Sequence, residues 1–305
     1  MRTPPPIAVD EGMWTFDNPP AAQLRRHYGW KPSKSWLDRL RLASVRFNDG
    51  GSGAFVSARG LVLTNHHVAM GQLQKMSTPR RDYVKDGFYA RRGAQEIRCP
   101  DLECNVLVSL EDVTRRVARA VPSGLSPAEA NARRKAVTAL IEKESAEATG
   151  LRSDVVELYQ GGEHWLYRYR KYTDMRLVMA PEVGAAFFGG DDDNFTYPRF
   201  ALDFAFFRVY EHGRPVRPRA FLPLHPAGPR EGELLFVSGH PGGTDRLLTS
   251  AQLDFERRAA MPERLELVRA RLAAVKDYQS RSPESARRGR DQRFGLENAD
   301  KALTG

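Results

Sequence analysis

Cysteine is scarce in this sequence, which has only Cys99 and Cys104 among its 305 residues. The two thiols lie close together in the chain and have no histidine beside them, which makes a poor ligand set for zinc. They could form a bridge if the chain folded back between them, but we expect them to be buried or free. The sequence predicts no metal site here and leaves the redox compartment undecided.

Long hydrophobic runs are also missing. No stretch approaches the roughly 18 to 20 apolar residues that a membrane-spanning helix requires, so no membrane span is expected. The first residues, MRTPPPIAVDEGMW, lack the apolar core of a secretory signal. The protein is therefore either cytosolic, or its signal has been removed or wrongly assigned.

Basic residues outnumber acidic ones, with 47 lysines and arginines, 38 aspartates and glutamates, and a net charge of +9. Such a balance raises the question of a nucleic-acid partner. The basic residues are scattered, however, and only RRGR, from Arg287 to Arg290, forms a short run. No nucleic-acid motif accompanies this run, so we expect no nucleic-acid partner.

Several segments carry strand patterns. GAFVSARG and LVLTNHH predict a hairpin that turns at residues 58–60, because short apolar runs flank a turn that ends in glycine. A strand is expected at 105–110, and residues 154–181 predict a strand, a Gly-Gly turn and an alternating strand. DFAFFRVYEHGRPV predicts a second hairpin with its turn at 211–214. GELLFVSGHPGGT predicts one more strand that leads into a glycine-rich turn.

The clearest helix is expected at residues 126–149. Ser126 can cap it, Pro127 suits the first helical position, and Glu129 completes a capping box. Gly150 is a natural stop. Residues 35–47 are expected to begin as a short amphipathic helix opened by Ser35.

Helical patterns take over from about Ala251. One apolar face recurs there at the spacing of an α-helix, formed by Leu265, Val268, Leu272 and Val275. We place a domain boundary near Thr249. The order of elements predicts a mainly β region with an inserted helix over residues 1–249, followed by the beginning of a helical domain over 250–305.

The segment Leu63-Thr64-Asn65-His66-His67 is the first candidate for chemistry. A histidine directly after an apolar strand is held by a rigid element and exposed at its end, where a general base is useful. A lone histidine is more often structural, but the preceding hairpin favours the functional interpretation. In chymotrypsin-like proteases a similar strand ends in a Thr-x-x-His segment, and Thr64 and His67 have that spacing.

Asp203 is the second candidate. It lies in LDFAFFRVY, where it opens an alternating apolar strand, although aspartate is a poor strand residue, so its position needs an explanation. A turn aspartate at the edge of a strand is one explanation. The other is the carboxylate that orients a catalytic histidine, which chymotrypsin-like enzymes carry in an Asp-apolar-Ala-apolar segment. Asp203 to Phe206 match that segment.

A glycine-rich acidic segment, from Gly189 to Phe195, contains three adjacent aspartates. These carboxylates suggest calcium, but the alternate ligand spacing and the closing glutamate of an EF-hand are missing. We therefore expect no metal at this segment.

Taken together, these segments resemble one family. MWTFDNPP, LASVRF, FVSARGLVLTNHH, YRYRKYTDMRLVMAPE, FGGDDDNFTYPRFALDFAFFRVY and GHPGGTDRLLT occur in the order typical of the bacterial dipeptidyl peptidases 7 and 11. The resemblance extends from about Asp10 to the end of the chain. It implies a chymotrypsin-like half-barrel followed by the start of an inserted α-helical domain.

The resemblance also implies roles for individual residues. His67 corresponds to the general base, and Asp203 corresponds to the aspartate that orients it. Asn194 and Phe195 correspond to an asparagine and a tryptophan that bind the free amino terminus of the substrate. Phe195 departs from the family by keeping an aromatic face without the N–H donor of tryptophan.

Two further departures concern cysteine and serine. Many members carry cysteines where Gly51 and Val68 stand, and both are replaced here. The family's nucleophile lies in a Gly-Asn-Ser-Gly turn of a second half-barrel, for which this chain has no counterpart. Ser52 and Ser238 are the serines we considered as substitutes, and both are better explained as structural. We expect this chain to be a truncated fragment that is inactive alone.

The resemblance predicts a serine-type dipeptidyl peptidase that releases dipeptides from peptides with a free N-terminus. Such a peptidase requires no cofactor or metal. The resemblance also implies a periplasmic or secreted location and a full-length protein that can form a homodimer. The alternatives are an endopeptidase of the same fold and a non-catalytic peptide-binding protein.

Overall fold

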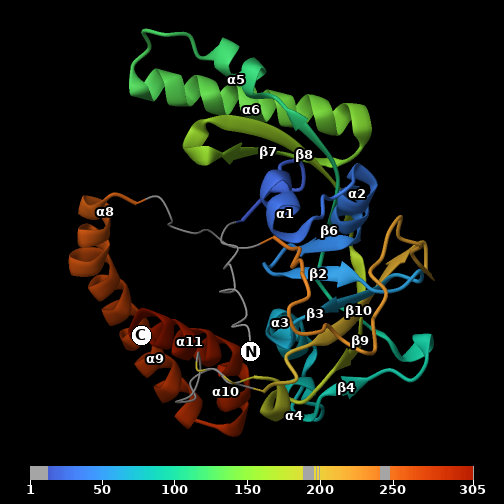
Figure 1. Cartoon of the computed structure of the whole chain (residues 1–305). Helices are drawn as coiled ribbons and strands as arrows, with labels where there is room; N and C mark the ends of the chain where they lie inside the picture. Colours follow the sequence, from blue (N-terminus) through green and yellow to red (C-terminus); the bar gives the residue numbers. More distant parts are fainter. Residues whose placement is uncertain (1–12, 188–195, 197, 199, 241–247, 305) are drawn as a thin grey trace, which may run out of the picture. The chain divides into compact units, whose positions relative to one another are not determined.

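The computed structural model describes residues 13–187, 196, 198, 200–240 and 248–304. The chain forms two compact units, and it passes from one to the other several times (Figure 1). Unit 1 comprises Met1–Ser44, Val106–Arg170 and Arg219–Ser238, whereas unit 2 comprises Val45–Asn105, Lys171–Pro218 and Gly239–Gly305.

Unit 1 packs helices against a β-hairpin. Its elements are α1 (Ala21–Tyr28), α2 (Lys34–Ala43), most of β6 (Cys104–Asp112), α5 (Thr114–Ala120), α6 (Pro127–Thr149), β7 (Arg152–Leu158), the short 3-10 turn Tyr159–Gly161 and β8 (Glu163–Tyr172). Strands β7 and β8 are antiparallel, and α6 lies along the hairpin (Figure 1). Val117 of α5, Ile141 of α6 and Leu166 of β8 meet in a small buried core.

Helix α6 confirms the expected helix at 126–149. The Ser126 hydroxyl accepts the backbone N–H of Glu129, while the Glu129 carboxylate accepts the backbone N–H of Ser126, which completes the capping box. At the other end, Gly150 adopts φ +67°, a left-handed conformation that ends the helix at low cost.

Unit 2 is built on an antiparallel sheet. Its strands are β1 (Ser44–Phe47), β2 (Ser52–Phe55), β3 (Leu61–Thr64), β4 (Phe88–Tyr89), β5 (Ile97–Arg98), β9 (Asp174–Ala180), β10 (Ala205–Glu211) and β11 (Arg214–Pro215). They follow the order β4-β9-β10-β3-β2-β1, with β5 beside β9 and β11 beside β10. The predicted hairpins are present as β2–β3 and β10–β11. The expected fold class, mainly β with α-helices, is confirmed.

The helices of unit 2 are α3 (His66–Met76), α4 (Tyr83–Asp86), the 3-10 turn Gly93–Gln95, α7 (Val183–Ala186), α8 (Ser250–Phe255), the π-helical turn Glu256–Ala260, α9 (Met261–Ser280), α10 (Pro283–Arg288) and α11 (Arg290–Thr304). The apolar face predicted for residues 265–275 lies on α9, where Val275 is buried. The division into domains at residue 249 stays a prediction.

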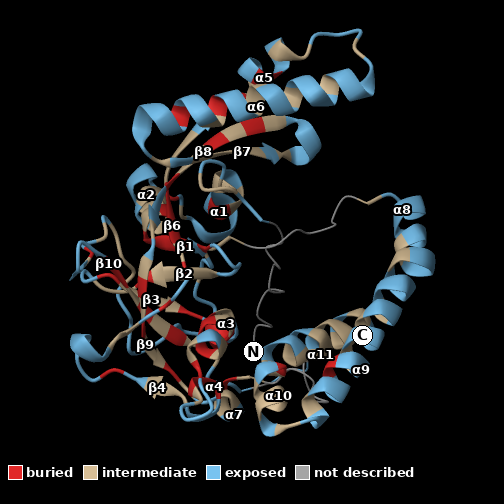
Figure 2. Cartoon of the chain, turned by 180° about the vertical axis from the view of Figure 1, so that it is seen from behind, coloured by how far each residue is buried: buried red, intermediate tan, exposed pale blue. Residues whose placement is uncertain are grey.

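The core of unit 2 lies on the strands and α3. Phe47, Phe55, Phe207 and Leu177 are almost fully buried, and Figure 2 shows the buried segments on the strands. Both cysteines are free and buried, as expected. Burial raises the pKa of Cys99 to about 12 and raises the pKa of Cys104 as well, so neither thiol forms a thiolate at neutral pH.

Two local predictions were wrong. Helix α2 is capped by Ser33, whose hydroxyl accepts the backbone N–H of Trp36, rather than by Ser35. The strand expected in GELLFVSGHPGGT is irregular backbone over residues 233–238. Its apolar pattern is suited to a strand, but no described strand pairs with it, and Leu235 and Val237 are exposed.

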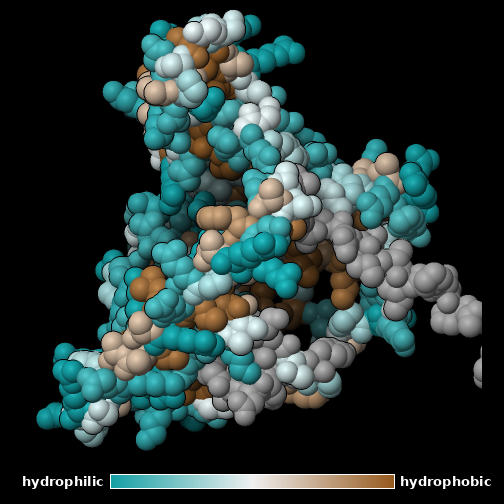
Figure 3. Space-filling view, turned by 90° about the vertical axis from the view of Figure 1, so that its left-hand side faces the viewer, coloured by the Kyte–Doolittle hydropathy of each residue, from teal (hydrophilic) through white to brown (hydrophobic). Residues whose placement is uncertain are grey.

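Apolar side chains reach the surface at several places. On the face shown in Figure 3, hydrophilic residues predominate and apolar residues gather in patches between them. In α8 of unit 2, Leu253 and Phe255 are exposed. In unit 1, the rings of Trp30, Trp36 and Phe236 form a cluster with centroids 4.9 to 5.2 Å apart.

The basic run at 287–290 binds groups of the protein itself. Arg290 donates to both carboxylate oxygens of Asp82, at 2.9 and 3.0 Å, and the same carboxylate caps α4. Arg287 donates to the backbone carbonyl of Ser77, directly after α3, and the side chain of Gln74 donates to the carbonyl of Arg287. The run therefore joins α10 and α11 to α3 and α4.

Replacing Arg290 with alanine should lower the free energy of unfolding by about 1 to 2 kcal/mol. The bidentate pair is largely shielded from water, and its loss leaves the Asp82 carboxylate without its charged partner. The expected loss stays small because both side chains keep some exposure to water, which screens part of their attraction. Urea denaturation of the two proteins at pH 7 measures the difference.

Arg288 provides the matched control, since its side chain is 65% exposed and pairs with Glu284 in the same helix. Arg288→Ala should leave the stability nearly unchanged. Burial raises the pKa of Asp82. Hydrogen bonds from Arg290 and from the backbone N–H groups that Asp82 caps outweigh this effect and lower that pKa overall. The contribution of the pair is therefore present above the ordinary aspartate value of 3.8 and is lost as the pH falls through the lower folded-state pKa. Equal losses in both variants would contradict an anchoring role for Arg290.

Candidate active site

His67 is held at the junction of a strand and a helix. Strand β3 ends at Thr64, whose hydroxyl donates to the backbone carbonyl of Ser52 at 2.7 Å, and α3 begins at His66. The two adjacent histidines point to different environments. His66 is fully buried, while the side chain of His67 is 52% exposed. The fold thus assigns packing to the first histidine and leaves the second accessible.

Asp203 lies two residues before β10, and its side chain is next to His67. This strand begins at Ala205, two residues later than the sequence indicated, and Ala205 pairs with Thr64 at the end of β3. That register places Asp203 beside the first turn of α3. The distance between His67 Nδ1 and Asp203 Oδ2 is 2.8 Å. The structure therefore brings together the two residues that the sequence singled out.

Two further contacts fix the carboxylate. The backbone N–H of His67 donates to Asp203 Oδ1 at 3.1 Å, and the Asn65 side-chain amide donates to Oδ2 at 3.1 Å. The same amide nitrogen also lies 3.1 Å from the backbone carbonyl oxygen of Asp203. Asn65 did not emerge from the sequence as a site residue, although its place in the Thr-x-x-His segment was a signal.

The electrostatics of the pair define its protonation. The hydrogen bond to Asp203 raises the pKa of His67, against the opposing effect of burial. Burial pushes the pKa of Asp203 upward, but hydrogen bonds from the His67 ring and backbone and from Asn65 hold it below its ordinary value. An ionised carboxylate can only accept hydrogen bonds, so Nδ1 of His67 carries the proton. In the neutral ring Nε2 is then unprotonated and can accept a proton.

The helix adds to this arrangement. The N-terminus of α3 carries unpaired backbone N–H groups and a partial positive charge, which favour a carboxylate. Asp203 supplies that carboxylate and caps the first turn. Burial lowers the pKa of His66, so the neighbouring histidine stays neutral. The pair is therefore one half-exposed imidazole held against one carboxylate.

Asn194 and Phe195 lie outside the described residues, as do Asp191, Asp192 and Asp193. The segment that contains them connects α7 to the residues before Asp203. The described residues on its two sides lie together, because the backbone N–H of Leu202 donates to the carbonyl of Ala185 at 2.9 Å. Ala185 and Leu202, which flank this segment in the sequence, are therefore in contact close to Asp203.

The two serines that the sequence raised as substitute nucleophiles have structural contacts. Ser52 Oγ accepts the backbone N–H of His240 at 2.6 Å, and Ser238 Oγ lies 2.8 Å from Ser44 Oγ. Each of these hydroxyl oxygens therefore accepts a hydrogen bond within the fold. Among the described residues, no group of three histidine, cysteine or carboxylate side chains is arranged to hold a metal ion. In the same residues, no helix has the length and apolar character needed to cross a membrane.

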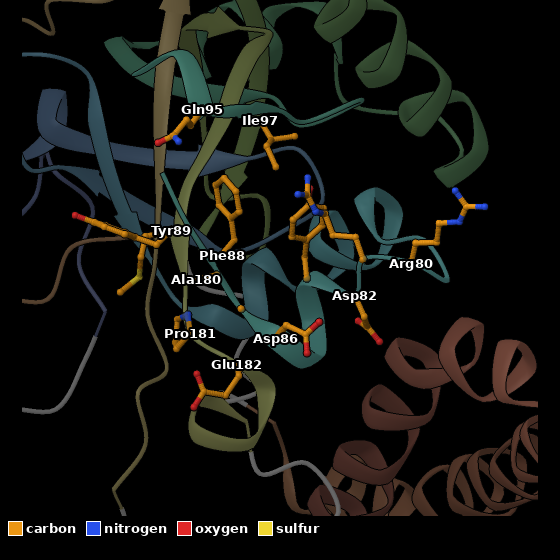
Figure 4. Close-up of a pocket in the computed structure, with 14 residues that line it drawn as sticks. Arg80, Asp82, Asp86, Phe88, Tyr89, Gln95, Ile97, Ala180, Pro181 and Glu182 are labelled. Atoms are coloured by element: carbon orange, nitrogen blue, oxygen red, sulfur yellow. The ribbon is translucent and has the colours of Figure 1, made fainter. Parts of the chain in front are cut away.

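A separate hollow of about 880 Å³ lies beside α4 and β4 (Figure 4). Its lining mixes aromatic and charged side chains, with Phe88 and Tyr89 on one side and Asp86 and Glu182 below them (Figure 4). Neither His67 nor Asp203 lines it, so this hollow does not contain the histidine–aspartate pair.

Gly51 and Val68 are in contact next to His67. A Cβ atom added to Gly51 would lie 2.6 and 2.8 Å from the two methyl groups of Val68, and Gly51 has φ +88°. These are the two positions at which the resemblance implies cysteines in many relatives. In this chain Gly51 and Val68 stand at these positions and pack closely against each other.

Gly51→Ala should therefore destabilise the protein by about 1 to 3 kcal/mol, through both the steric clash and the left-handed backbone. Gly50 is the matched control, since it has φ +96° with open space around it, so Gly50→Ala tests the backbone term alone. Thermal unfolding of both variants separates the two effects. Equal destabilisation of the two would contradict a clash with Val68, and the double variant Gly51→Ala with Val68→Ala should recover part of the loss.

With this geometry established, the relatives of the chain identify its family. The Peptidase S46 family model matches residues 9–305, and the chain belongs to that family. It is 34% identical to the dipeptidyl-peptidase 7 of Porphyromonas endodontalis over 79% of its length, covering 32% of that protein. It is 35% identical to the Asp/Glu-specific dipeptidyl-peptidase of Capnocytophaga gingivalis over 70% of its length, covering 31% of that protein.

A solved structure is similar over almost the whole chain. The crystal structure of Porphyromonas endodontalis DPP11 in complex with the dipeptide Arg-Glu matches 97% of this chain and 46% of that one, with a TM-score of 0.83 and 26% identity. The chain spans about a third of the length of the curated relatives named above. The resemblance to dipeptidyl peptidases 7 and 11 is confirmed by these findings.

Proposed function

We propose that this chain supplies the general base and its orienting carboxylate to a serine-type dipeptidyl peptidase. The observation that carries the proposal is the 2.8 Å contact between His67 Nδ1 and Asp203 Oδ2, with the ring half exposed. Membership of the Peptidase S46 family supports it, because the matched relatives are dipeptidyl-peptidases. The 305 residues contain no Gly-Asn-Ser-Gly sequence, so the proposal assigns no nucleophile to this chain.

The reaction follows from the protonation state of the pair. His67 Nε2 takes the proton of the attacking serine hydroxyl while the serine oxygen bonds to the scissile carbonyl carbon. The ring becomes an imidazolium, which the adjacent Asp203 carboxylate stabilises. His67 then gives that proton to the amide nitrogen as the bond between this nitrogen and the carbonyl carbon breaks, and the dipeptide stays bound to the serine as an acyl-enzyme. Water attacks the acyl-enzyme by the same route and releases the dipeptide.

Recognition of the substrate's amino terminus is assigned to Asn194 and Phe195. The amide oxygen of asparagine can accept a hydrogen bond from an α-ammonium group, and an aromatic face attracts the same cation by roughly 0.5 to 2 kcal/mol. The aspartates at 191–193 add negative charge to the segment. In the sequence this segment precedes Asp203, and the described residues Ala185 and Leu202 on its two sides are joined by a backbone hydrogen bond.

The test uses a full-length polypeptide that joins this chain to the family's second half-barrel, with the serine in its Gly-Asn-Ser-Gly turn. It compares a peptide that has a free N-terminus with the same peptide acetylated, and mass spectrometry identifies the products. We expect dipeptides from the free peptide only. In Asn194→Ala, their release should fall while the melting temperature stays nearly unchanged. Cleavage within the acetylated peptide would instead support an endopeptidase, and binding without cleavage a peptide-binding protein.

The pH dependence provides a second arm of the test. The base must be unprotonated, and the pKa of His67 is raised above the ordinary value of 6.5. The acid limb of kcat/KM should therefore lie above pH 6.5, with activity lost as the pH falls through it. An acid limb that lies below pH 6.5 would argue against His67 as the base.

A further inference from the structure

Asn65 occupies the N-cap position of α3 but does not cap it. Asparagine is among the best N-cap residues because its side-chain oxygen accepts a backbone N–H of the first turn. The backbone of Asn65 has the extended conformation of a cap, yet its side chain makes no capping hydrogen bond. A favourable local interaction is thus given up at this position.

The side chain is turned to Asp203 instead. Its amide nitrogen lies 3.1 Å from Asp203 Oδ2 and 3.1 Å from the backbone carbonyl oxygen of the same residue. Both partners are acceptors, so the NH2 group of the amide must face them. In exchange, Asp203 Oδ1 receives the His67 N–H that a cap would have received. Asp203 therefore caps α3 in place of Asn65, and the Asn65 side chain binds Asp203.

We propose that Asn65 is a positioning residue that holds the Asp203 carboxylate in the orientation His67 needs. The inference rests on the proposed function of the His67–Asp203 pair. The terminal torsion of an aspartate has a broad, shallow energy profile, so a carboxylate needs partners to fix its plane. The Asp203 side chain is 31% exposed and open to competing water. Asn65 binds both the carboxylate and the backbone from which it extends, which fixes one relative to the other.

This role can be separated from a purely electrostatic one by the direction of a pKa change. If Asn65 only stabilised the negative charge of the carboxylate, its removal would leave the carboxylate in place and raise the pKa of Asp203. The pKa of His67 would then stay the same or rise. If Asn65 positions the carboxylate, its removal lets Oδ2 leave Nδ1. The hydrogen bond that raises the pKa of His67 is then weakened, and that pKa falls.

The experiment follows the NMR titration of the His67 ring in the 305-residue chain. The signal is assigned among the seven histidines with the variant His67→Gln. Asn65→Ala and Asn65→Ser are the test variants, and serine can cap α3 itself and so preserves the helix. Asn48→Ala is the matched control. The side-chain amide of Asn48 likewise donates a hydrogen bond to a backbone carbonyl, that of Asp101.

We expect the pKa of His67 to fall in both Asn65 variants and to be unchanged in Asn48→Ala, with the melting temperature of Asn65→Ser close to that of the wild type. In a polypeptide with the serine segment, Asn65→Ser should lower turnover about 10- to 100-fold through the misplaced base. An unchanged or higher pKa of His67 in Asn65→Ser would overturn the inference.

Asp203→Asn in the same titration separates this inference from the proposed function. If Asp203→Asn lowers the pKa of His67 and the Asn65 variants do not, the pair stands and only the role of Asn65 is wrong. If Asp203→Asn has no effect either, the pair itself fails.

Discussion

Asp203→Asn should reduce the turnover of an active enzyme that contains this chain by about 10⁴-fold. The substitution keeps the size of the side chain, and its oxygen can still accept the His67 backbone N–H. Its NH2 group would then face His67 Nδ1 and donate to it. The ring would adopt the other tautomer, with the proton on Nε2, and could no longer accept a proton from the serine.

Peptide turnover in the variant and the wild type measures this effect, with circular dichroism to confirm an unchanged fold. Asp254→Asn is the control, since Asp254 lies in α8 with its side chain 60% exposed. It should retain nearly full activity. A loss of less than about tenfold in Asp203→Asn would mean that the carboxylate does not set the tautomer of the base.

Phe207→Ala should lower the free energy of unfolding by about 3 to 5 kcal/mol. Phe207 is 1% exposed at the centre of β10, and its ring stands edge-on to that of Phe47, 6.1 Å away. Truncation removes most of a buried side chain and leaves a cavity that the surrounding strands cannot close, since β10 is paired with both β3 and β9.

Chemical denaturation measures this loss, and Phe255→Ala is the matched control. Phe255 ends α8 and is 63% exposed, so its truncation should cost less than about 1 kcal/mol. Because β10 leads directly from Asp203, the Phe207 variant should also disturb the His67–Asp203 contact. A cost below about 1 kcal/mol for Phe207→Ala would show that the core does not depend on this ring.

The parts of the fold that sequence predicted well are those with local signals. Helix α6 has its cap, its first-turn proline and its terminal glycine within one segment, and the β2–β3 hairpin has its turn glycine between two apolar runs. Ser33 and Ser35 are both good caps two residues apart, so the choice between them depended on packing. The segment at 233–238 has a strand pattern, but pairing requires a partner strand that the pattern itself cannot specify.

The residues of the candidate site could also be predicted from local signals, but their contact could not. His67 and Asp203 could be found because each follows or precedes an apolar strand in a recognisable segment. Their contact depends on the pairing of Ala205 with Thr64, which the sequence does not encode locally. Asn65 was missed for a related reason. As an asparagine before a helix it resembles an ordinary cap, and only the structure shows that its side chain binds Asp203.

The tautomer of His67 tests the central claim most directly. Nitrogen-15 NMR of the chain above the pKa of His67 distinguishes a proton on Nδ1 from a proton on Nε2. The 2.8 Å contact with an ionised Asp203 predicts the proton on Nδ1, leaving Nε2 free to accept one. In Asp203→Asn the proton should move to Nε2. A wild-type His67 with its proton on Nε2, unchanged by Asp203→Asn, would contradict the assignment of these two residues as base and orienting carboxylate.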